Sequence, residues 1–373
     1  MKIEQLIYAN SSFDGASTLG NAADWVLVFG SRELMAEKAI FDQIRSMYPR
    51  AYIMGCSTAG EMHKTFVREG GLCVTAIHFE KATVSFHQAT FDKEEDFSYI
   101  ASHLLENLEK TDLRHIFVLA DGLTVNGSSL IRGFNRSLPE GVTVSGGLAA
   151  DSSKYKKTLI MANSYPREKA IVFAAIYGNI RISSVAATGW KSFGIERLVT
   201  RSQGRTLYEL DGKPALDLYK AYLGEHAKNL PLSGVRFPLS FRPEHSDSYY
   251  IRSLQSVNEE EKSILFFGEI PQGSYCKLTR ANPYNLLDGA KEAAEESLRQ
   301  LGTEPEFVIA VSCRGRQFIL RQMTEDELLT LRETLGCKPI LTGFYSYGEF
   351  LCRNKRNSCE MHNQTMMVTL FAE

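Results

Sequence analysis

Short apolar runs alternate along the chain with segments whose apolar residues fall on one helical face. The run at 25–29, Trp-Val-Leu-Val-Phe, is typical of a buried strand. After it, apolar residues recur every three or four positions, as on one side of a helix. These are Ile40, Phe41, Ile44, Met47 and Tyr48. A glycine-containing segment at 52–61 and a strand-like run at 72–79 complete the pattern, which predicts an α/β (α+β) fold of sheets packed with helices.

The same order of elements occurs three times. A second copy runs from the apolar segment 116–120 to 170–177, and a third runs from 307–312 to 365–371. In the first and third copies the second strand leads into the pattern Gly-x-x-x-x-Gly-Glu, and the second copy has an aspartate where the acid falls. The repetition predicts three strand-helix-strand-strand units of similar structure.

The stretch between the second and third copies differs in character. A helix is expected to begin at Pro214, and the proline-punctuated, aromatic segment 231–243 is typical of a linker or cross-over. We therefore expect two domains, at 1–224 and 225–373. Further on, Asn282 followed by proline predicts a helix start, and Thr324 with Glu327 predicts a capping box.

The composition and charge of the chain limit the classes of protein to which it can belong. Hydrophobic residues make up 44% of the chain, charged residues make up 23%, and the formal net charge is -2. Since lysines and arginines are spread along the chain, neither nucleic acid nor an anionic membrane is an expected partner. The first residues do not form a signal peptide, and no apolar stretch approaches the ~18 residues of a membrane span, so we expect a cytoplasmic protein.

The seven cysteines are scattered and form no Cys-x-x-Cys pair. Reduced thiols are the simplest interpretation. The closest group, Cys352, Cys359 and His362, has a longer gap than the about two to four residues that are usual in structural zinc sites. Buried core thiols are therefore favoured over zinc.

The ends of the second strands are candidates for a ligand site, because α/β sheets usually bind ligands at strand ends. Glycines there let backbone N–H groups approach a ligand, and hydroxyl groups add donors. In the first two copies the candidates are Cys56, Ser57, Thr58, Gly60, Glu61, Gly146, Gly147 and Asp151. A tight turn that only satisfies backbone groups fits the same residues equally well.

The third copy adds charged and aromatic candidates. Arg314 and Arg316 flank a glycine in an expected loop, and paired guanidinium groups suit a carboxylate or phosphate. Solvated surface arginines would have the same spacing. Tyr345, Tyr347 and Glu349 could face the same pocket. We expect Arg316→Ala to weaken ligand binding without unfolding the protein.

Enzymatic function has weaker support. Cys56, His63 and Glu61 are the residue types of a nucleophile, a base and an orienting acid, but closeness in sequence does not establish hydrogen bonds in space. The chain has neither a Gly-x-x-x-x-Gly-Lys-Ser/Thr loop nor a Gly-x-Ser-x-Gly elbow. We expect a protein that is not an enzyme, with a Cys-dependent hydrolase or transferase as an alternative.

Several segments, in the right order, resemble the FIST N-terminal and C-terminal domains. They are 55–62, 145–151, Gly189-Trp190 with Gly194, 212–215 followed by Tyr219 and Leu223, and 343–349 with 362–365. The resemblance covers nearly the whole chain. It implies a sensory module of bacterial signal transduction that binds a small ligand, such as an amino acid or a similar small anion.

The resemblance also implies partners and a cofactor alternative. A separate signalling protein, such as a histidine kinase of a two-component system or a cyclic-di-GMP enzyme, is expected to receive the signal. Some stand-alone FIST proteins bind haem and sense nitric oxide, and His115 is then the candidate axial ligand. A homodimer is compatible with this interpretation. We expect a ligand between the two domains to shift their arrangement.

Overall fold

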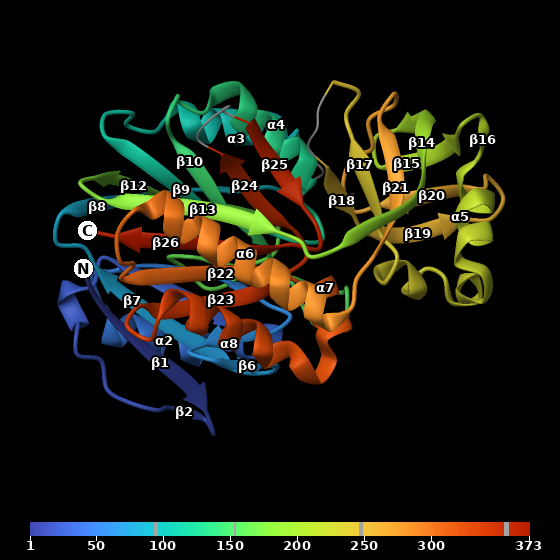
Figure 1. Cartoon of the computed structure of the whole chain (residues 1–373). Helices are drawn as coiled ribbons and strands as arrows, with labels where there is room; N and C mark the ends of the chain where they lie inside the picture. The colour runs from blue at the N-terminus through green and yellow to red at the C-terminus, as the bar shows by residue number, and fades with distance from the viewer. Residues whose placement is uncertain (93–95, 153, 246–248, 354–357) are drawn as a thin grey trace.

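A three-part body with a smaller lobe beside it makes up the computed structural model (Figure 1). The structure describes residues 1–373 apart from 93–95, 153, 246–248 and 354–357. Each part of the body contains one mixed sheet, and the lobe contains a fourth sheet. Helices pack on these sheets, so the predicted α/β (α+β) class is confirmed. None of the helices described is both long enough and apolar enough to cross a membrane.

Each part of the body is one copy of the repeated unit. In each unit the first and second strands are separated in the sequence by helical residues and pair in parallel. A closing strand then pairs antiparallel with the first. A strand that precedes each unit pairs with its closing strand. The three repeats predicted from the sequence are therefore confirmed.

The elements follow the same order in all three units. The first unit has β1 (Lys2–Ala9), β2 (Ser12–Phe13), η1 (Gly20–Ala22), β3 (Trp25–Gly30), α1 (Arg32–Met35), α2 (Lys38–Met47), β4 (Tyr52–Ser57) and β7 (Leu72–His78). The second has β8 (Ala82–Thr90), α3 (Phe97–Glu106), β9 (Leu113–Ala120), α4 (Gly127–Ser137), β10 (Thr143–Leu148) and β12 (Ala170–Gly178). The third has β13 (Arg181–Ala187), α6 (Pro283–Leu301), β22 (Phe307–Cys313), α7 (Arg314–Leu320), η4 (Arg321–Met323), α8 (Thr324–Leu335), β23 (Ile340–Ser346) and β26 (Met366–Ala372).

Each unit gives strands to a neighbouring sheet. The first unit gives β5 (Glu61–His63) and β6 (Phe66–Arg68) to the sheet of the third, where β5 pairs with β23. The third gives β24 (Glu349–Arg353) and β25 (Ser358–His362) to the second, where β24 pairs with β10. The second gives β11 (Ile160–Ala162) to β4 of the first. The exchange is circular, so every sheet of the body contains strands from more than one unit.

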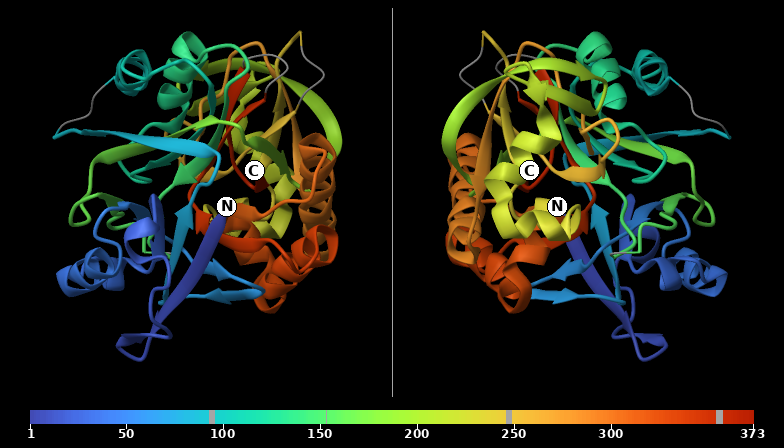
Figure 2. Two further views of the ribbon diagram at one scale, coloured as in Figure 1. Left: turned by 90° about the vertical axis from the view of Figure 1, so that its left-hand side faces the viewer. Right: turned by 90° about the vertical axis from the view of Figure 1, so that its right-hand side faces the viewer.

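The first strand of each unit is buried on both faces. On β3, Trp25, Leu27 and Phe29 join a cluster shared by all three sheets, whereas Val26 and Val28 pack with residues of α2. Burial on both faces explains why such runs are continuously apolar. Figure 2 shows the three sheets around a common centre, and Figure 1 shows the two termini close together at the end of the body away from the lobe.

The glycines Gly55, Gly146 and Gly343 hold equivalent places on the second strands. A β-carbon at these positions would lie 2.1, 1.9 and 2.0 Å from a backbone oxygen of the neighbouring first strand. These oxygens belong to Val28, Val118 and Ala310. The repeated glycine is thus required by close backbone approach between strands.

The lobe is inserted into the third unit, between β13 and α6. Its outer strands β14 (Lys191–Gln203) and β21 (Tyr275–Arg280) pair where they leave the body, so the two connections run side by side. The lobe has its own hydrophobic core. Its other elements are β15 (Thr206–Leu210), β16 (Lys213–Pro214), α5 (Ala215–Leu223), η2 (Gly224–Asn229), η3 (Leu232–Val235), β17 (Leu239–Arg242), β18 (Tyr250–Arg252), β19 (Leu254–Asn258) and β20 (Ser263–Phe266).

Several local predictions are corrected. The segment 231–243 is not all linker, because it contains β17, which pairs with β18 and β21. The residues after β22 form α7 rather than a loop. Helix α8 has no side-chain cap, since Glu327 is engaged in a buried ion pair. The Asn282 cap is confirmed by its bond from the Asn285 N–H. The boundary near 225 falls within η2 and stays a prediction.

The cysteine prediction is wrong for one pair. Cys352 and Cys359 lie opposite each other on β24 and β25 and form a disulfide. They are therefore not reduced thiols. Among the residues described, Cys337 is the exposed free cysteine, and the other free thiols are buried.

Candidate functional site

The ends of the second strands meet where the body faces the lobe. The N–H of Ala150 donates to the backbone oxygen of Ser57 at 2.8 Å, and the Tyr347 hydroxyl donates to the Asp151 carboxylate. Nearby, the amide of Gln364 donates to the Ser253 hydroxyl of the lobe at 2.9 Å. The structure thus brings the three predicted strand ends together.

Most of the predicted ligand-binding residues are buried there. Arg314 is partly exposed, whereas the others are covered by neighbouring protein. The buried residues are Cys56, Ser57, Thr58, Gly60, Glu61, Gly146, Gly147, Asp151, Arg316, Tyr345, Tyr347 and Glu349. Direct contact with a ligand would require these residues to become exposed, so their role in binding stays a prediction.

The three repeated acids fix their own loops. Glu61 accepts hydrogen bonds from the Thr58 hydroxyl at 2.6 Å and the Gly71 N–H at 3.1 Å. Glu349 accepts corresponding bonds from Ser346 at 2.7 Å and Thr365 at 2.8 Å. Burial raises the pKa of Glu61 to about 8 and the pKa of Glu349 to about 7. Both carboxyls therefore titrate near neutral pH.

Asp151, the acid of the second unit, has different partners. Its carboxylate accepts the backbone N–H groups of Tyr155, Lys156 and Lys157 at 2.8 to 2.9 Å. The ring of Tyr155 stacks on Tyr347 with centroids 4.6 Å apart and lies 6.4 Å from that of Phe267 in the lobe. Asp151 therefore fixes the backbone of residues 155–157, and Tyr155 in this segment lies beside the lobe.

Arg316 lies in a closed ion-pair network. Its Nε and Nη2 groups donate to Glu327 at 2.8 and 2.6 Å, and Nη2 also donates to the Leu286 carbonyl at 2.7 Å. Glu327 accepts further bonds from Ser312 and Tyr345. Because the side chains of the pair are fully buried, this arginine already has a complete set of partners.

The Cys56 side chain lacks the surroundings of an activated nucleophile. Burial, followed by the nearby Glu61, raises the pKa of its thiol well above the ordinary value. Burial also lowers the pKa of His63 to about 4. Cys56 lies on β4 in one sheet, whereas His63 lies on β5 in another. This geometry gives no support to a Cys56 thiolate with His63 as its base.

His115 does not fit as an axial ligand of haem. Its ring is fully buried, Nδ1 lies 2.7 Å from the Thr143 hydroxyl, and Nε2 lies 2.8 Å from the Ser145 hydroxyl. Burial lowers the pKa of this imidazole to about 3. Iron could bind either nitrogen only if one of these hydrogen bonds broke and the ring became exposed. Among the described residues, no group of three or more His, Cys, Asp or Glu could hold a metal ion.

A cavity of about 220 Å³ lies between the body and the lobe. The body contributes Ser128 and Ile131 of α4 and Cys359, Glu360 and Met361 of the β25 strand. The lobe contributes Pro243, Tyr249, Tyr250, Arg252, Glu269 and Pro271. Because its walls come from both parts, movement of the lobe would change the shape of this cavity.

Sequence reasoning missed the residues that join the lobe to the body. Arg252 donates to the backbone oxygen of Met361 at 2.9 Å, and Tyr155 and Gln364 make the contacts described above. Of the three, only Gln364 carried a signal, in the segment 362–365. Tyr155 and Arg252 belong to no repeat or motif, so their role depends on how the lobe packs.

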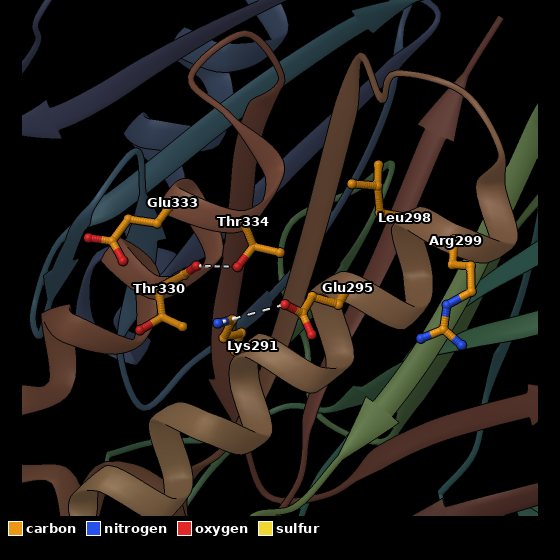
Figure 3. Close-up of a pocket in the computed structure, with 7 residues that line it drawn as sticks. All are labelled: Lys291, Glu295, Leu298, Arg299, Thr330, Glu333 and Thr334. Carbon is orange, nitrogen blue, oxygen red and sulfur yellow. Dashed lines mark hydrogen bonds and ion pairs between the residues drawn. The ribbon is translucent and has the colours of Figure 1, made fainter.

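A larger hollow lies on the outer surface, between α6 and α8 (Figure 3). It has a volume of about 530 Å³ and contains none of the predicted residues. Lys291 lies 3.8 Å from Glu295, and Arg299 lies 2.5 Å from Glu296. These paired charges are typical of a solvated helix surface.

Comparisons with protein families cover nearly the whole chain. A family model described as the FIST N domain matches residues 24–213, and one described as the FIST C domain matches residues 215–352. Uncharacterized protein MJ1623 of Methanocaldococcus jannaschii is 23% identical over 331 residues, which are 82% of this chain. The match spans 62% of that relative's length. Uncharacterized protein Rv0628c of Mycobacterium tuberculosis is 22% identical over 386 residues, covering 100% of this chain and 88% of its own.

Solved structures show only distant similarity. A chorismatase structure aligns with a TM-score of 0.36 and 7% identity, covering 100% of this chain and 98% of its own. A cyanuric acid hydrolase from A. caulinodans aligns with a TM-score of 0.37 and 6% identity, with the same coverage.

Proposed function

Because the chain belongs to the FIST family, whose domains are sensor domains of signal transduction, we propose that it binds a small ligand between body and lobe. The ligand is an amino acid or a similar small anion, and the protein acts inside the cell without catalysing a reaction. Ligand binding alters a surface that a separate signalling protein recognises. A histidine kinase or a cyclic-di-GMP enzyme is the proposed partner.

The cavity shared by both parts is the observation that carries this proposal. A ligand there touches body and lobe at once, so its affinity depends on their relative position. The lobe is connected to the body by only two chain segments, and these are paired at Lys191 and Arg280. Two adjacent connections can act as one hinge.

The interface between body and lobe combines a small apolar cluster around Ile251 with separate polar contacts, which suits a change of arrangement. Gln364 donates to Ser253, and Arg132 of α4 pairs with Glu269 of the lobe. Arg252 reaches the Met361 carbonyl. A ligand that strengthens or replaces these bonds favours one arrangement over another, which is the differential affinity that signalling requires.

Distance measurement between body and lobe tests the proposal. Cys337 on the body is exposed and accepts a spin label, and Lys213→Cys places a second label on the exposed β16 strand of the lobe. Amino acids and small organic acids that raise the melting temperature are then added to the doubly labelled protein. We expect a shift in the label-to-label distance. Ligands that bind tightly but leave the distance distribution unchanged would contradict lobe movement.

A further inference from the structure

Arg252 lies in the wall of the interlobe cavity with an incomplete set of partners. The residue is only 8% exposed. Its Nη1 donates to the Ile251 and Met361 carbonyls at 3.2 and 2.9 Å, and Nε donates to the Glu269 carbonyl at 3.3 Å. Among the described residues, no atom accepts a hydrogen bond from Nη2, and no carboxylate oxygen lies within 4.0 Å of the guanidinium.

A buried charge without a counter-ion is costly, because carbonyl dipoles replace only part of its lost hydration. The Tyr250 ring offsets a further part of the cost of burying this charge, since the guanidinium carbon lies 4.2 Å from the ring centroid. Arg316, by contrast, is fully buried and has its own carboxylate. An anion in the cavity would give Arg252 the partner that Arg316 finds within the chain.

We propose that the interlobe cavity is an anion site in which the acid group of a small organic monocarboxylate binds Arg252. This inference rests on the proposed sensor function and specifies the class of ligand. Nη2 donates to one carboxylate oxygen of the ligand while Nη1 and Nε keep their carbonyl partners.

The charges around the cavity favour one negative charge on the ligand over two. Glu269 is already paired with Arg132, but Glu360 also lies in the wall, with its side chain 41% exposed and 3.4 Å from His362. One arginine beside a carboxylate suits a carboxylate ligand, whereas a phosphate dianion would be repelled more strongly. An ammonium group on the ligand could instead approach Glu360.

The rest of the lining limits the size and polarity of the ligand. Ile131, Met361 and the two prolines provide apolar contact, and Tyr249 adds a ring. The volume of about 220 Å³ is below the ~300 to 1,000 Å³ of sites for drug-sized ligands. The ligand is therefore a compact acid with an apolar body.

Matched ligands test the site on the full chain. Phenylacetate and its neutral analogue phenylacetamide are titrated by calorimetry at neutral pH, and phenylphosphonate is compared with phenylacetate at a pH high enough to make the phosphonate a dianion. We expect phenylacetate to bind at least about tenfold more tightly than phenylacetamide. The neutral amide cannot form the charge-assisted hydrogen bond that the carboxylate forms with Arg252. Phenylphosphonate should also bind more weakly than phenylacetate.

Matched variants locate the site. Arg252→Gln should weaken phenylacetate binding about ten- to a hundredfold. Arg136→Gln removes an exposed charge from the same helix as Ile131 and should leave the affinity unchanged. Glu360→Gln should tighten phenylacetate binding and leave the amide unaffected, since it removes repulsion. If Arg252→Gln fails to fold, Glu360→Gln and the comparison of acid with amide still decide the question.

Three results would overturn the anion site. They are equal affinity for acid and amide, unchanged affinity in folded Arg252→Gln, or no saturable binding of phenylacetate, benzoate or L-phenylalanine at about 10 mM. If a ligand moves the lobe but binds Arg252→Gln normally, the anion site fails and the sensor proposal stands. If no compound moves the lobe while acid binding depends on Arg252, the sensor proposal fails and the anion site stands.

Discussion

Arg316 and Glu327 form a pair in which each residue depends on the other. Both side chains are fully buried, and Glu327 also accepts hydrogen bonds from Ser312 and Tyr345. Removal of one charge from such a pair leaves the other without compensation in a medium of low polarity. Spacing alone predicted that Arg316 contacts a ligand and that its replacement leaves the protein folded. The structure predicts instead that replacing Arg316 destabilises the fold.

Arg316→Ala should lower the free energy of unfolding by about 3 to 5 kcal/mol, because the Glu327 charge stays buried. Urea denaturation at neutral pH measures this loss. Arg314→Ala is the matched control on the same helix, since Arg314 is partly exposed and 4.0 Å from Glu69. It should change stability by no more than about 0.5 kcal/mol. A fully stable Arg316→Ala protein would show that the pair is dispensable.

The buried carboxyls predict a pH dependence of stability. Burial raises the pKa of Glu61 to about 8 and that of Glu349 to about 7, from the ordinary glutamate value of 4.5. Between the unfolded and folded pKa values the folded state binds more protons, so stability falls as pH rises. Burial also lowers the pKa of His63 and His115, which has the opposite effect below 6.5. From pH 6.5 to 8 the two carboxyls therefore have a larger effect than the two histidines on how the free energy of unfolding changes with pH.

We expect the free energy of unfolding to drop from pH 6.5 to pH 8 by about 1 kcal/mol or more. In the double variant Glu61→Gln/Glu349→Gln most of this drop should disappear, because an amide keeps the shape and does not titrate. Glu304→Gln, at a side chain 82% exposed, serves as the control and should keep the full dependence. Identical pH profiles for the double variant and the parent would contradict the raised pKa values.

At the scale of the element, the local hydrophobic pattern predicted the strands and helices that pack within one repeated unit. The strands at 25–29 and 307–312 and the helix before Gly55 are confirmed, because periodicity reports which face is buried. The exchanged strands were not predicted, since their partners lie in another unit. Local pattern also located the converging strand ends, but it could not show whether their polar groups face a ligand or bond to one another. Thr58 and Glu61, for example, bond to each other.

The repeated glycine gives a prediction for the second strands. Gly343→Ala should destabilise the protein by about 1 to 3 kcal/mol or more, because its β-carbon would lie 2.0 Å from the Ala310 oxygen and force β22 and β23 apart. Gly15→Ala is the control, since its β-carbon would meet only the end of the Leu6 side chain, at 3.3 Å. Thermal unfolding of both variants measures the difference. Equal melting temperatures would mean that the strand pair relaxes easily.

For the whole molecule, the circular exchange of strands closes the body without the lobe. The three sheets of the body share clusters to which the lobe contributes no residue, and the lobe has its own core. One apolar contact between them is a small cluster in which Ile251 of the lobe meets Trp190, Leu286 and Leu320. The sequence showed that the stretch between the second and third copies differs in character, but it did not show that this stretch forms a separate lobe, because the lobe interrupts the third repeat between β13 and α6.

Replacing residues 191–280 by a two-residue turn tests this division. The gap is short, because Lys191 and Arg280 are paired across β14 and β21, and directly opposed residues lie about 5 Å apart. We expect the shortened protein to unfold in one cooperative transition, at a lower temperature because Leu286 and Leu320 become exposed. It should bind no phenylacetate, since Arg252 is gone. A shortened protein without a cooperative transition would show that the lobe is required to complete the body, and ligand binding could then not be transmitted by movement of the lobe as a separate unit.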